Sequence, residues 1–255
     1  MRTDIRRGEG FGKVRWPPLK ILLANPNATE AITETCSVLA RAVASPGTEV
    51  IGWTNREGPP MVDSFYSDYA AGRALSRSLA RWAPPPDAVV LAGFGNYGTA
   101  AVKEVMDVPV LNLAEAALAF AIPFCHRFAV LTTSPRMVPY TQDLIALLGL
   151  TGRCAGVRAV KLPPLDATEP SPPEAESEVL AAIDHVVAES AADLVILGGS
   201  RLSPYAAHIR DRAPVPVVEP VACAVRMAES AVRLGLRQSK TCKFAPPTGM
   251  HDRWA

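Results

Sequence analysis

The sequence lacks the features of membrane proteins and of nucleic-acid-binding proteins. No apolar run reaches the roughly 18 residues that a membrane-spanning helix needs, although 49% of the 255 residues are hydrophobic. The net charge is only +1 and charges of one sign form no long run, so neither a nucleic-acid-binding surface nor a basic membrane patch is indicated. These absences favour a soluble, cytoplasmic protein with no nucleic-acid or membrane partner.

Metal-binding and disulfide patterns are also missing. The five cysteines are odd in number and include no CxxC pair and no Cys/His spacing of a metal site. They are expected to be reduced thiols, most of them buried. The four histidines show no ligand spacing either, so the sequence predicts no metal site.

The first 18 residues, MRTDIRRGEGFGKVRWPP, are basic but contain no apolar segment of the kind found in a secretory signal. Residues 1–18 are therefore expected to form a flexible leader. The length of the chain suits one large domain or two small lobes, and its apolar content is enough for a sizeable core.

Short apolar runs alternate with segments of helical spacing along the rest of the chain. The run at 88–92 is continuously apolar, which is typical of a parallel strand covered on both faces. The predicted strands span residues 20–24, 49–53, 88–92, 108–111, 128–132, 157–160, 194–197 and 215–218. The predicted helices span residues 28–44, 65–82, 115–122, 137–148, 174–189 and 221–234, and a proline-rich loop spans 162–173. Repeated strand–helix units indicate an α/β fold with parallel strands.

The chain contains an internal repeat, in which residues 86–121 align with residues 192–228. The repeat predicts two pseudo-symmetric lobes, each a mainly parallel sheet flanked by helices. Because parallel strands place ligands beyond their carboxyl ends, an active-site cleft is expected between the lobes. The expected boundaries are 19–114 plus 219–240 for lobe 1, 115–218 for lobe 2 and 241–255 for a C-terminal tail.

Several segments, taken in order, resemble the aspartate/glutamate/hydantoin racemase superfamily, and its hydantoin racemase branch in particular. The matching segments are ILLANPNATEAIT (21–33), GPP (58–60), GFGNYG (93–98), RFAVLTTSPR (127–136), LVILGG (194–199), PVVEPVACAV (216–225) and SKTCKFAPP (239–247). The resemblance implies a cofactor-independent enzyme with a small-molecule substrate, and we expect a homo-oligomer. In the family, two cysteines on opposite faces of the substrate remove and return the α-proton.

This sequence departs from the family at both cysteine positions, which Gly93 and Gly199 occupy. The two positions align in the repeat, so we interpret both glycines as functional replacements. They are expected to leave space on both faces of the site and to expose main-chain N–H groups to an anion. Gly95 and Gly98 are interpreted as residues of a tight turn. None of the five cysteines lies at another strand-to-loop junction of the repeat.

Other positions of the family pattern are kept. Asn27, Thr132 and Thr133 resemble residues that hold carboxylate or imide oxygens, and such donors can stabilise a developing enolate. Ser200 can donate a further hydrogen bond. The resemblance therefore implies an oxyanion pocket that remains without the thiols.

New polar residues stand beside the two glycine positions. Asn96 and Tyr97 follow Gly93 and are, with Thr133 and Ser200, the candidate catalytic residues. The candidate substrate-binding residues are Asn27, Gly93, Thr132, Gly199, Arg201 and Tyr205. Arg201 either clamps a carboxylate or phosphate or lies in solvent at a helix start.

The remaining candidates each leave two alternatives open. Tyr97 and Tyr205 either supply a general acid or form the walls of the cleft. Glu115 and Glu219 follow equivalent strands and either act as bases or cap the next helix. His208 either approaches the site or is an ordinary surface or core histidine.

Three functions remain open from the sequence. The favoured hypothesis is a lyase that decarboxylates, eliminates, opens or closes a ring in a small carboxylate, imide or hydantoin-like compound. It is favoured because polar residues have been gained at the expected pocket, and the resemblance allows it because the superfamily includes one-cysteine arylmalonate decarboxylases. The alternatives are a racemase that uses bases other than cysteine and a non-catalytic small-molecule binder.

Overall fold

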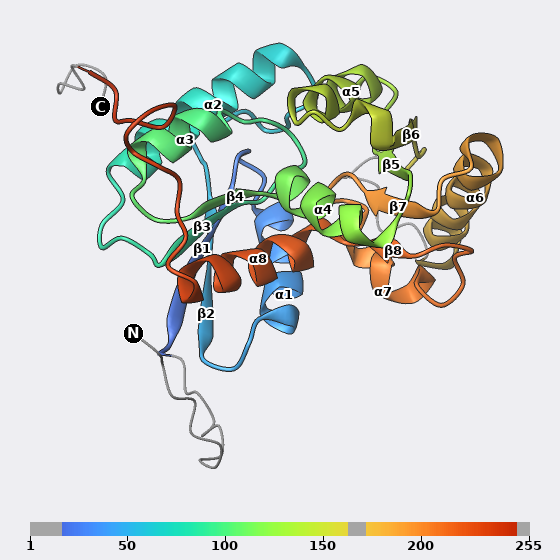
Figure 1. The fold of residues 1–255 in the computed structure, drawn as a ribbon, viewed down its shortest axis with the longest axis horizontal. Coiled ribbons are helices and arrows are strands. Elements are labelled where there is room, and N and C mark those ends of the chain that lie inside the picture. The colour runs from blue at the N-terminus through green and yellow to red at the C-terminus, as the bar shows by residue number, and fades with distance from the viewer. Residues whose placement is uncertain (1–16, 163–171, 249–255) are drawn as a thin grey trace, which may run out of the picture.

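Eight short strands form two separate parallel sheets in the computed structural model, which describes residues 17–162 and 172–248 (Figure 1). The strand order is β2-β1-β3-β4 in the first sheet and β6-β5-β7-β8 in the second. The strands are β1 (Leu19–Asn25), β2 (Thr48–Thr54), β3 (Ala88–Leu91), β4 (Val110–Asn112), β5 (Phe128–Thr132), β6 (Cys154–Ala159), β7 (Leu194–Leu197) and β8 (Val217–Val218). Every pair of neighbouring strands is parallel, which confirms the predicted α/β fold with two similar lobes.

Helices cover the sheets. They are α1 (Glu30–Val43), α2 (Phe65–Ala80), α3 (Thr99–Val105), α4 (Leu113–Ala121), α5 (Met137–Leu147), α6 (Pro172–Ser190), α7 (Ala206–Ile209) and α8 (Pro220–Arg233), with short 3-10 turns at η1 (Ile122–Phe124), η2 (Thr151–Arg153) and η3 (Ser203–Tyr205). The chain returns at its end to the first lobe, because α8 packs against α1, α4 and β3. Figure 1 shows α8 lying between α1 and α4.

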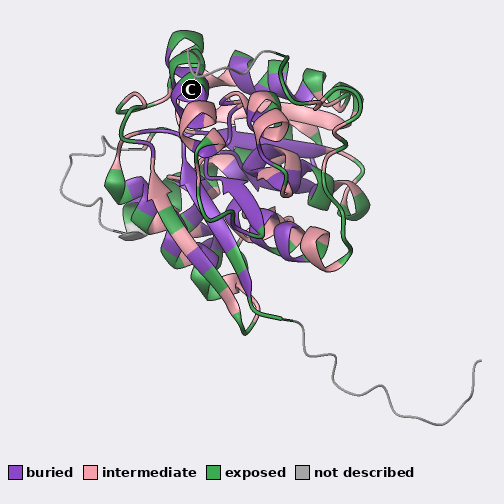
Figure 2. Ribbon diagram, turned by 90° about the vertical axis from the view of Figure 1, so that its left-hand side faces the viewer, coloured by how far each residue is buried: buried purple, intermediate pink, exposed green. Residues whose placement is uncertain are grey.

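Alternate residues of each central strand pack into different clusters, as the period of two in a strand requires. Ile21 and Leu23 of β1 pack with α1, α4 and α8, whereas Leu22 of the same strand packs with α2 and α3. The first of these clusters continues into the second sheet through Phe128 and Val130 of β5. The two lobes therefore share one apolar core, and Figure 2 shows the buried strands at the centre of the molecule.

Equivalent hydrogen bonds confirm the internal repeat. The Asp87 carboxylate accepts a bond from the Lys20 N–H at 2.7 Å, and the Asp193 carboxylate accepts one from the Arg127 N–H at 2.9 Å. At the other ends of the strands, the Gly93 N–H donates to the Leu91 carbonyl at 2.9 Å. The Gly199 N–H donates to the Leu197 carbonyl at 2.8 Å. Gly93 and Gly199 therefore occupy the same place in their two lobes.

The predicted strands and helices are present, with ends shifted by a few residues. The largest shift is in β6, which begins at Cys154 rather than at the predicted 157. The short helix α3 was not predicted, because the glycines of 93–98 before it favour a loop. Residues 1–16 of the predicted leader and residues 163–171 of the predicted loop at 162–173 lie outside the described residues.

The segment after α8 is tied to the first lobe. The Gln238 side-chain amide donates to the carbonyls of Met106 and Val108 at 2.9 and 2.7 Å, and Lys240 Nζ donates to the Lys103 carbonyl at 2.7 Å. This part of the chain therefore runs along α3 and the start of β4. Within residues 17–162 and 172–248, no helix is both long and apolar enough to cross a membrane.

A buried carboxylate connects α8 to the turn between α1 and β2. The Glu229 side chain is 1% exposed. It accepts hydrogen bonds from the Ser45 N–H at 2.7 Å, the Ser45 hydroxyl at 2.8 Å and the Thr48 hydroxyl at 2.6 Å, and Arg226 lies at 3.2 Å. Burial acts to raise the pKa of Glu229, but the hydrogen bonds from Thr48 and Ser45 outweigh it and lower the pKa.

We expect Glu229→Ala to lower the free energy of unfolding by about 3 kcal/mol at pH 7, because several buried donors lose a charged acceptor. Since the folded pKa is depressed, the stabilisation is present above the unfolded value of about 4.3 and is lost as the pH falls through the folded value. Urea unfolding of the native protein and the variant at neutral and acidic pH measures this difference.

The exposed Glu34, whose side chain is 71% exposed, provides the matched control Glu34→Ala, which should change the free energy of unfolding by less than about 0.5 kcal/mol. If the difference in free energy of unfolding between the native protein and Glu229→Ala stays constant on acidification, the assignment of a depressed pKa to Glu229 is contradicted.

Candidate functional site

The ends of strands from both sheets meet at one small cavity of about 80 Å³. Its walls come from the segments that follow β1, β3, β5 and β7. Met61 and Val62 of the β2–α2 loop, Ile32 of α1 and Met137 of α5 add apolar surface. Since both sheets contribute to the walls, the cavity lies between the lobes, as expected for an open α/β fold. Its volume lies well below the roughly 300–1,000 Å³ of pockets for drug-sized ligands, so it suits a small molecule.

Most of the predicted site residues line this cavity. Those that do are Asn27, Gly93, Tyr97, Thr132, Thr133, Gly199, Ser200 and Arg201. Asn96 and Tyr205 do not line it. The main chain at Tyr97 has a positive φ of 45°, and this turn directs the Tyr97 side chain to the cavity in place of that of Asn96. Tyr205 ends the turn η3, one turn beyond the Ser200–Arg201 wall.

The Tyr97 ring covers Gly93. A β-carbon built on Gly93 would lie 2.9 Å from the Tyr97 hydroxyl oxygen and closer still to the ring. The expectation that Gly93 leaves open space on its face of the site is therefore wrong, because the phenol fills that space. Gly93 is required for this contact, since any side chain there would overlap the ring.

Different contacts explain the neighbouring glycines, Gly95 and Gly98. A β-carbon on Gly95 would meet the same Tyr97 ring, at 2.5 Å from the carbon that bears the hydroxyl. Gly98 has a φ of 64°, a conformation that glycine adopts without strain, and it packs against Gly72 of α2. Turn geometry thus explains Gly98, whereas Gly95 is explained by the tyrosine.

Tyr97 is a neutral phenol at ordinary pH. Burial, followed by the nearby Asp68 and Cys36, raises the pKa of Tyr97 above its usual value. Its hydroxyl makes no hydrogen bond to any residue that the structure describes. The group can therefore donate a hydrogen bond or a proton to a molecule in the cavity.

Asn27 presents an oriented amide. Its Oδ1 accepts hydrogen bonds from Asn25 Nδ2 at 3.1 Å and from the Thr29 N–H at 2.9 Å. These two donors fix the amide plane, so that Nδ2 is left to donate, and within the described ranges no protein atom accepts from it. Asn27 is 8% exposed and lines the cavity, so this donor is available to a bound oxyanion.

The second lobe contributes hydroxyl groups. A β-carbon on Gly199 would lie 3.0 Å from the Thr133 methyl carbon, so this wall is less crowded than the wall at Gly93. Thr132, Thr133 and Ser200 line the cavity, and their hydroxyls have no hydrogen-bond partner among the described residues. Burial lowers the pKa of Arg201, which also lines the cavity.

The acidic candidates have other roles. Glu219 caps α8 and accepts hydrogen bonds from the N–H groups of Val221 and Ala222 at 2.8 and 2.7 Å, as one alternative predicted. Glu115 does not cap α4, the helix to which it belongs. It pairs with Lys103 at 2.7 Å, because Asn112, the residue equivalent to Glu219, already caps α4.

The cysteines and His208 are also absent from the cavity walls. Cys36 is buried and Cys242 is exposed, while the other three thiols are partly exposed, so the expectation that most are buried is wrong. Burial and then Glu219 raise the pKa of Cys36 and of Cys223 to about 12. His208 lies 2.6 Å from Glu176 with a 60% exposed side chain. Across the described residues, no three His, Cys, Asp or Glu side chains are grouped so that they could hold a metal ion.

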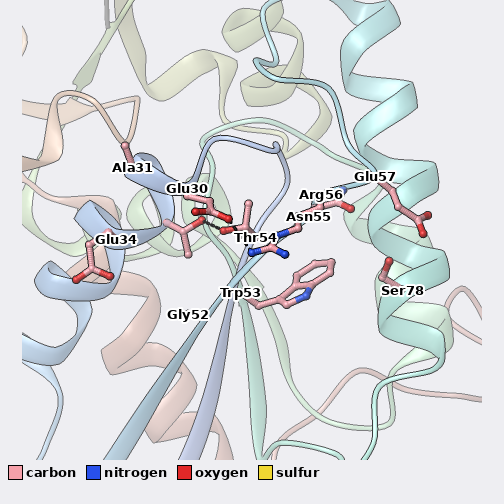
Figure 3. Close-up of a pocket in the computed structure, with 11 residues that line it drawn as sticks. Glu30, Ala31, Glu34, Gly52, Trp53, Thr54, Asn55, Arg56, Glu57 and Ser78 are labelled. Atoms are coloured by element: carbon pink, nitrogen blue, oxygen red, sulfur yellow. Dashed lines mark hydrogen bonds and ion pairs between the residues drawn. The ribbon is translucent and has the colours of Figure 1, made fainter. Parts of the chain in front are cut away.

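A larger depression of about 800 Å³ lies at the edge strand β2 (Figure 3). Its rim carries Glu30, which pairs with Arg56 at 2.8 Å. Figure 3 shows Glu34 and Glu57 on opposite sides of Trp53. None of the predicted site residues lines this depression. Its charged side chains lie at the surface, as they do on an ordinary solvated face of a protein.

Sequence reasoning missed two residues that hold the Tyr97 loop, Asp68 of α2 and Tyr140 of α5. The Asp68 carboxylate accepts hydrogen bonds from the Tyr97 N–H at 2.8 Å and from the Tyr140 hydroxyl at 2.7 Å. The available signal was the acidic Asp68 on the buried face of a helix, a position that usually requires a partner.

We expect Gly93→Ala to lower the free energy of unfolding by about 1–3 kcal/mol, because its methyl group would overlap the Tyr97 ring. In a Tyr97→Ala background, Gly93→Ala should lower the free energy of unfolding much less. Urea unfolding of the native protein, the two single variants and the double variant gives the coupling energy directly.

Gly152→Ala is the matched control, because a β-carbon there meets nothing within 4 Å. An equal cost of Gly93→Ala with and without the tyrosine would contradict the packing of this ring over Gly93.

Comparisons with known proteins find relatives that match almost the whole chain. The hydantoin racemase of Paenarthrobacter aurescens is 32% identical over 232 residues, which cover 90% of this chain and 98% of the relative. The solved allantoin racemase from Klebsiella pneumoniae is 32% identical with a TM-score of 0.85 and covers 90% of this chain and 94% of its own. The solved allantoin racemase from Pseudomonas fluorescens is 37% identical with a TM-score of 0.79. The match covers 91% of this chain and 99% of the solved chain.

The family model for Asp/Glu/Hydantoin racemase matches residues 21–228. This range includes both sheets, the cavity between them and most of α8. The chain therefore belongs to the Asp/Glu/hydantoin racemase family.

Proposed function

We propose that this protein is an enzyme that uses the Tyr97 phenol as its proton donor and acts as a lyase on a small carboxylate, imide or hydantoin-like compound. The observation that carries the proposal is the composition of the cavity wall. Hydroxyl, amide and guanidinium donors surround the space, while no carboxylate, imidazole or thiol from the described part of the chain lines it. Decarboxylation fits this set of groups best.

Racemisation and decarboxylation place different demands on the protein. A racemase must remove a proton from carbon, which requires a base. In a decarboxylation the departing CO₂ leaves its bonding electron pair on the α-carbon, so that no base is needed. A substituted malonate dianion would lose CO₂, the resulting enolate would take one proton from Tyr97, and a monocarboxylate would be released. The Tyr97 phenolate would then regain its proton from water.

The polar donors would stabilise the enolate oxygens. Asn27 Nδ2 is held in orientation by its neighbours, and the Thr132, Thr133 and Ser200 hydroxyls lack protein partners among the described residues. Donors fixed before the reaction stabilise developing negative charge without reorganisation. Elimination, ring opening and cyclisation belong to the same proposal, because each can pass through an oxyanion.

A racemase acting on a hydantoin-like compound without cysteine bases is the second candidate. The names of the relatives favour it, since hydantoin racemase and allantoin racemases are 32–37% identical to this chain. In that case the cavity would hold a five-membered cyclic ureide, and a base would have to come from water or from a group outside the cavity wall. We further propose a cytoplasmic homo-oligomer that needs no cofactor.

We expect the native protein to release CO₂ from a 2-substituted malonate and to add one deuterium at the α-carbon in deuterated water. Tyr97→Phe should lower kcat by about 10²–10⁴-fold, the usual contribution of a general acid, while the ring still packs over Gly93. Tyr69→Phe, at a tyrosine 77% exposed on α2, should leave kcat unchanged. Proton NMR measures both the exchange and the product.

The same experiment with a 5-substituted hydantoin and with allantoin separates the alternatives. Rapid α-exchange of a hydantoin by the native protein, without CO₂ release from the malonate, would favour the racemase. Binding without turnover of any compound would favour a non-catalytic binder.

We expect alkylation of the native protein by iodoacetamide to leave this activity unchanged, because no cysteine lines the cavity. The exposed Cys242 should react first, while the raised pKa of Cys36 and Cys223 slows their reaction. Mass spectrometry identifies the modified residue. A loss of activity that follows the modification of one cysteine, and that substrate prevents, would overturn the thiol-free proposal.

A further inference from the structure

We infer that Asp68 and Tyr140 are positioning residues that hold the Tyr97 phenol over the cavity, and that this arrangement depends on contact between the two lobes. The inference rests on the proposed function, because it concerns the same phenol. Neither residue lines the cavity, so any effect of the pair on a bound molecule passes through Tyr97.

The backbone of Tyr97 needs support. Its φ of 45° lies in the left-handed region, which is strained for a residue other than glycine. The Asp68 carboxylate, in a residue only 7% exposed, accepts the Tyr97 N–H at 2.8 Å. A hydrogen bond to a buried charged group offsets this strain.

A second hydrogen bond holds the preceding residue. The Tyr140 hydroxyl donates to the same Asp68 oxygen at 2.7 Å and accepts the Asn96 N–H at 2.7 Å. Two consecutive N–H groups of the loop are therefore bound by one Asp–Tyr pair. The loop is also held by Asn112, whose Nδ2 donates to the Gly95 carbonyl at 2.6 Å.

The pair joins elements of different lobes. Asp68 belongs to α2, which packs on the first sheet, whereas Tyr140 belongs to α5, which packs on β5 and β6 of the second. The ring of Phe65, at the start of α2, also contacts the Tyr140 ring at a centroid distance of 5.4 Å. Separation of the lobes at this edge would remove the hydroxyl from Asp68 and Asn96. The Tyr97 loop is thus complete only when the lobes are in contact.

Such support matters for chemistry because proton transfer requires close geometry. A displacement of about 1 Å between reacting groups can reduce a rate by roughly 10²-fold. The Tyr97 ring has no hydrogen bond of its own to a described residue. Its position therefore depends on the backbone of its loop and on its packing against Gly93, Gly95 and the apolar cluster of α2 and α3.

The test uses three variants of the full chain, Tyr140→Phe, Asp68→Ala and Asp68→Asn. Tyr140→Phe keeps the ring contact with Phe65 and removes only the hydroxyl. We expect kcat for the malonate to fall about 10–100-fold in Tyr140→Phe and in Asp68→Ala. KM should change less than about threefold, because the variants would disturb the alignment of Tyr97 in the transition state rather than the binding of the substrate. Asp68→Asn keeps an acceptor oxygen, so its kcat should be close to that of the native protein. Tyr69→Phe, on the exposed face of α2, is the control.

Amide hydrogen exchange provides a readout that needs no substrate. Measured by NMR, exchange should rise at Asn96 in Tyr140→Phe and at Tyr97 in Asp68→Ala, by about tenfold or more, and stay near native in Asp68→Asn. Native kcat and native exchange in Tyr140→Phe would overturn the positioning role. Increased exchange throughout α2 in Tyr140→Phe, together with a fall in melting temperature, would also overturn the positioning role, because it would indicate general destabilisation. If Tyr97→Phe keeps full activity, the proposed function fails, while the exchange data still decide whether the pair holds the loop.

Discussion

The packing of the Tyr97 ring over Gly93 and Gly95 is the contact on which the cavity depends. One aromatic side chain accounts for two glycines, since a β-carbon at either would overlap it. It also accounts for the left-handed backbone at Tyr97 and for the buried Asp68 that binds its N–H. A single tyrosine at this place therefore restricts two positions that precede it in sequence and one position on a helix of the first lobe.

The two lobes are alike in backbone and different in chemistry. Equivalent hydrogen bonds fix Gly93 and Gly199 at the same position of their lobes, but a phenol covers the first glycine and the Thr133 side chain lies beside the second. The cavity thus has one wall with a phenol and one wall with hydroxyl-bearing residues. In the proposed reaction a planar intermediate would receive its proton from the Tyr97 wall, so that a prochiral substrate would give one enantiomer.

Much of the fold was accessible from the sequence, because continuous apolar runs such as Ala88–Leu91 have few alternatives to a buried parallel strand. The existence of a cleft was accessible because parallel strands place ligands beyond their carboxyl ends, whereas residues such as Asn27, Thr132 and Thr133 were named from the resemblance to the racemase superfamily. Side-chain direction was not accessible. A glycine in GFGNYG can leave space or accommodate a neighbour, and only the φ of Tyr97 decides which. The partnership of Asp68 with Tyr140 joins residues 72 positions apart, which no local pattern encodes.

The return of α8 to the first lobe has a consequence for how the chain matures. Strands β1 to β4 are complete by Asn112, yet the helix that packs against β3, α1 and α4 begins only at Pro220. During synthesis from the N-terminus, the part of the first sheet and of α1 and α4 that α8 covers therefore stays exposed while more than a hundred further residues are added. Over that interval the nascent chain presents a surface of the kind that molecular chaperones bind, and the second lobe has time to fold before the first is finished.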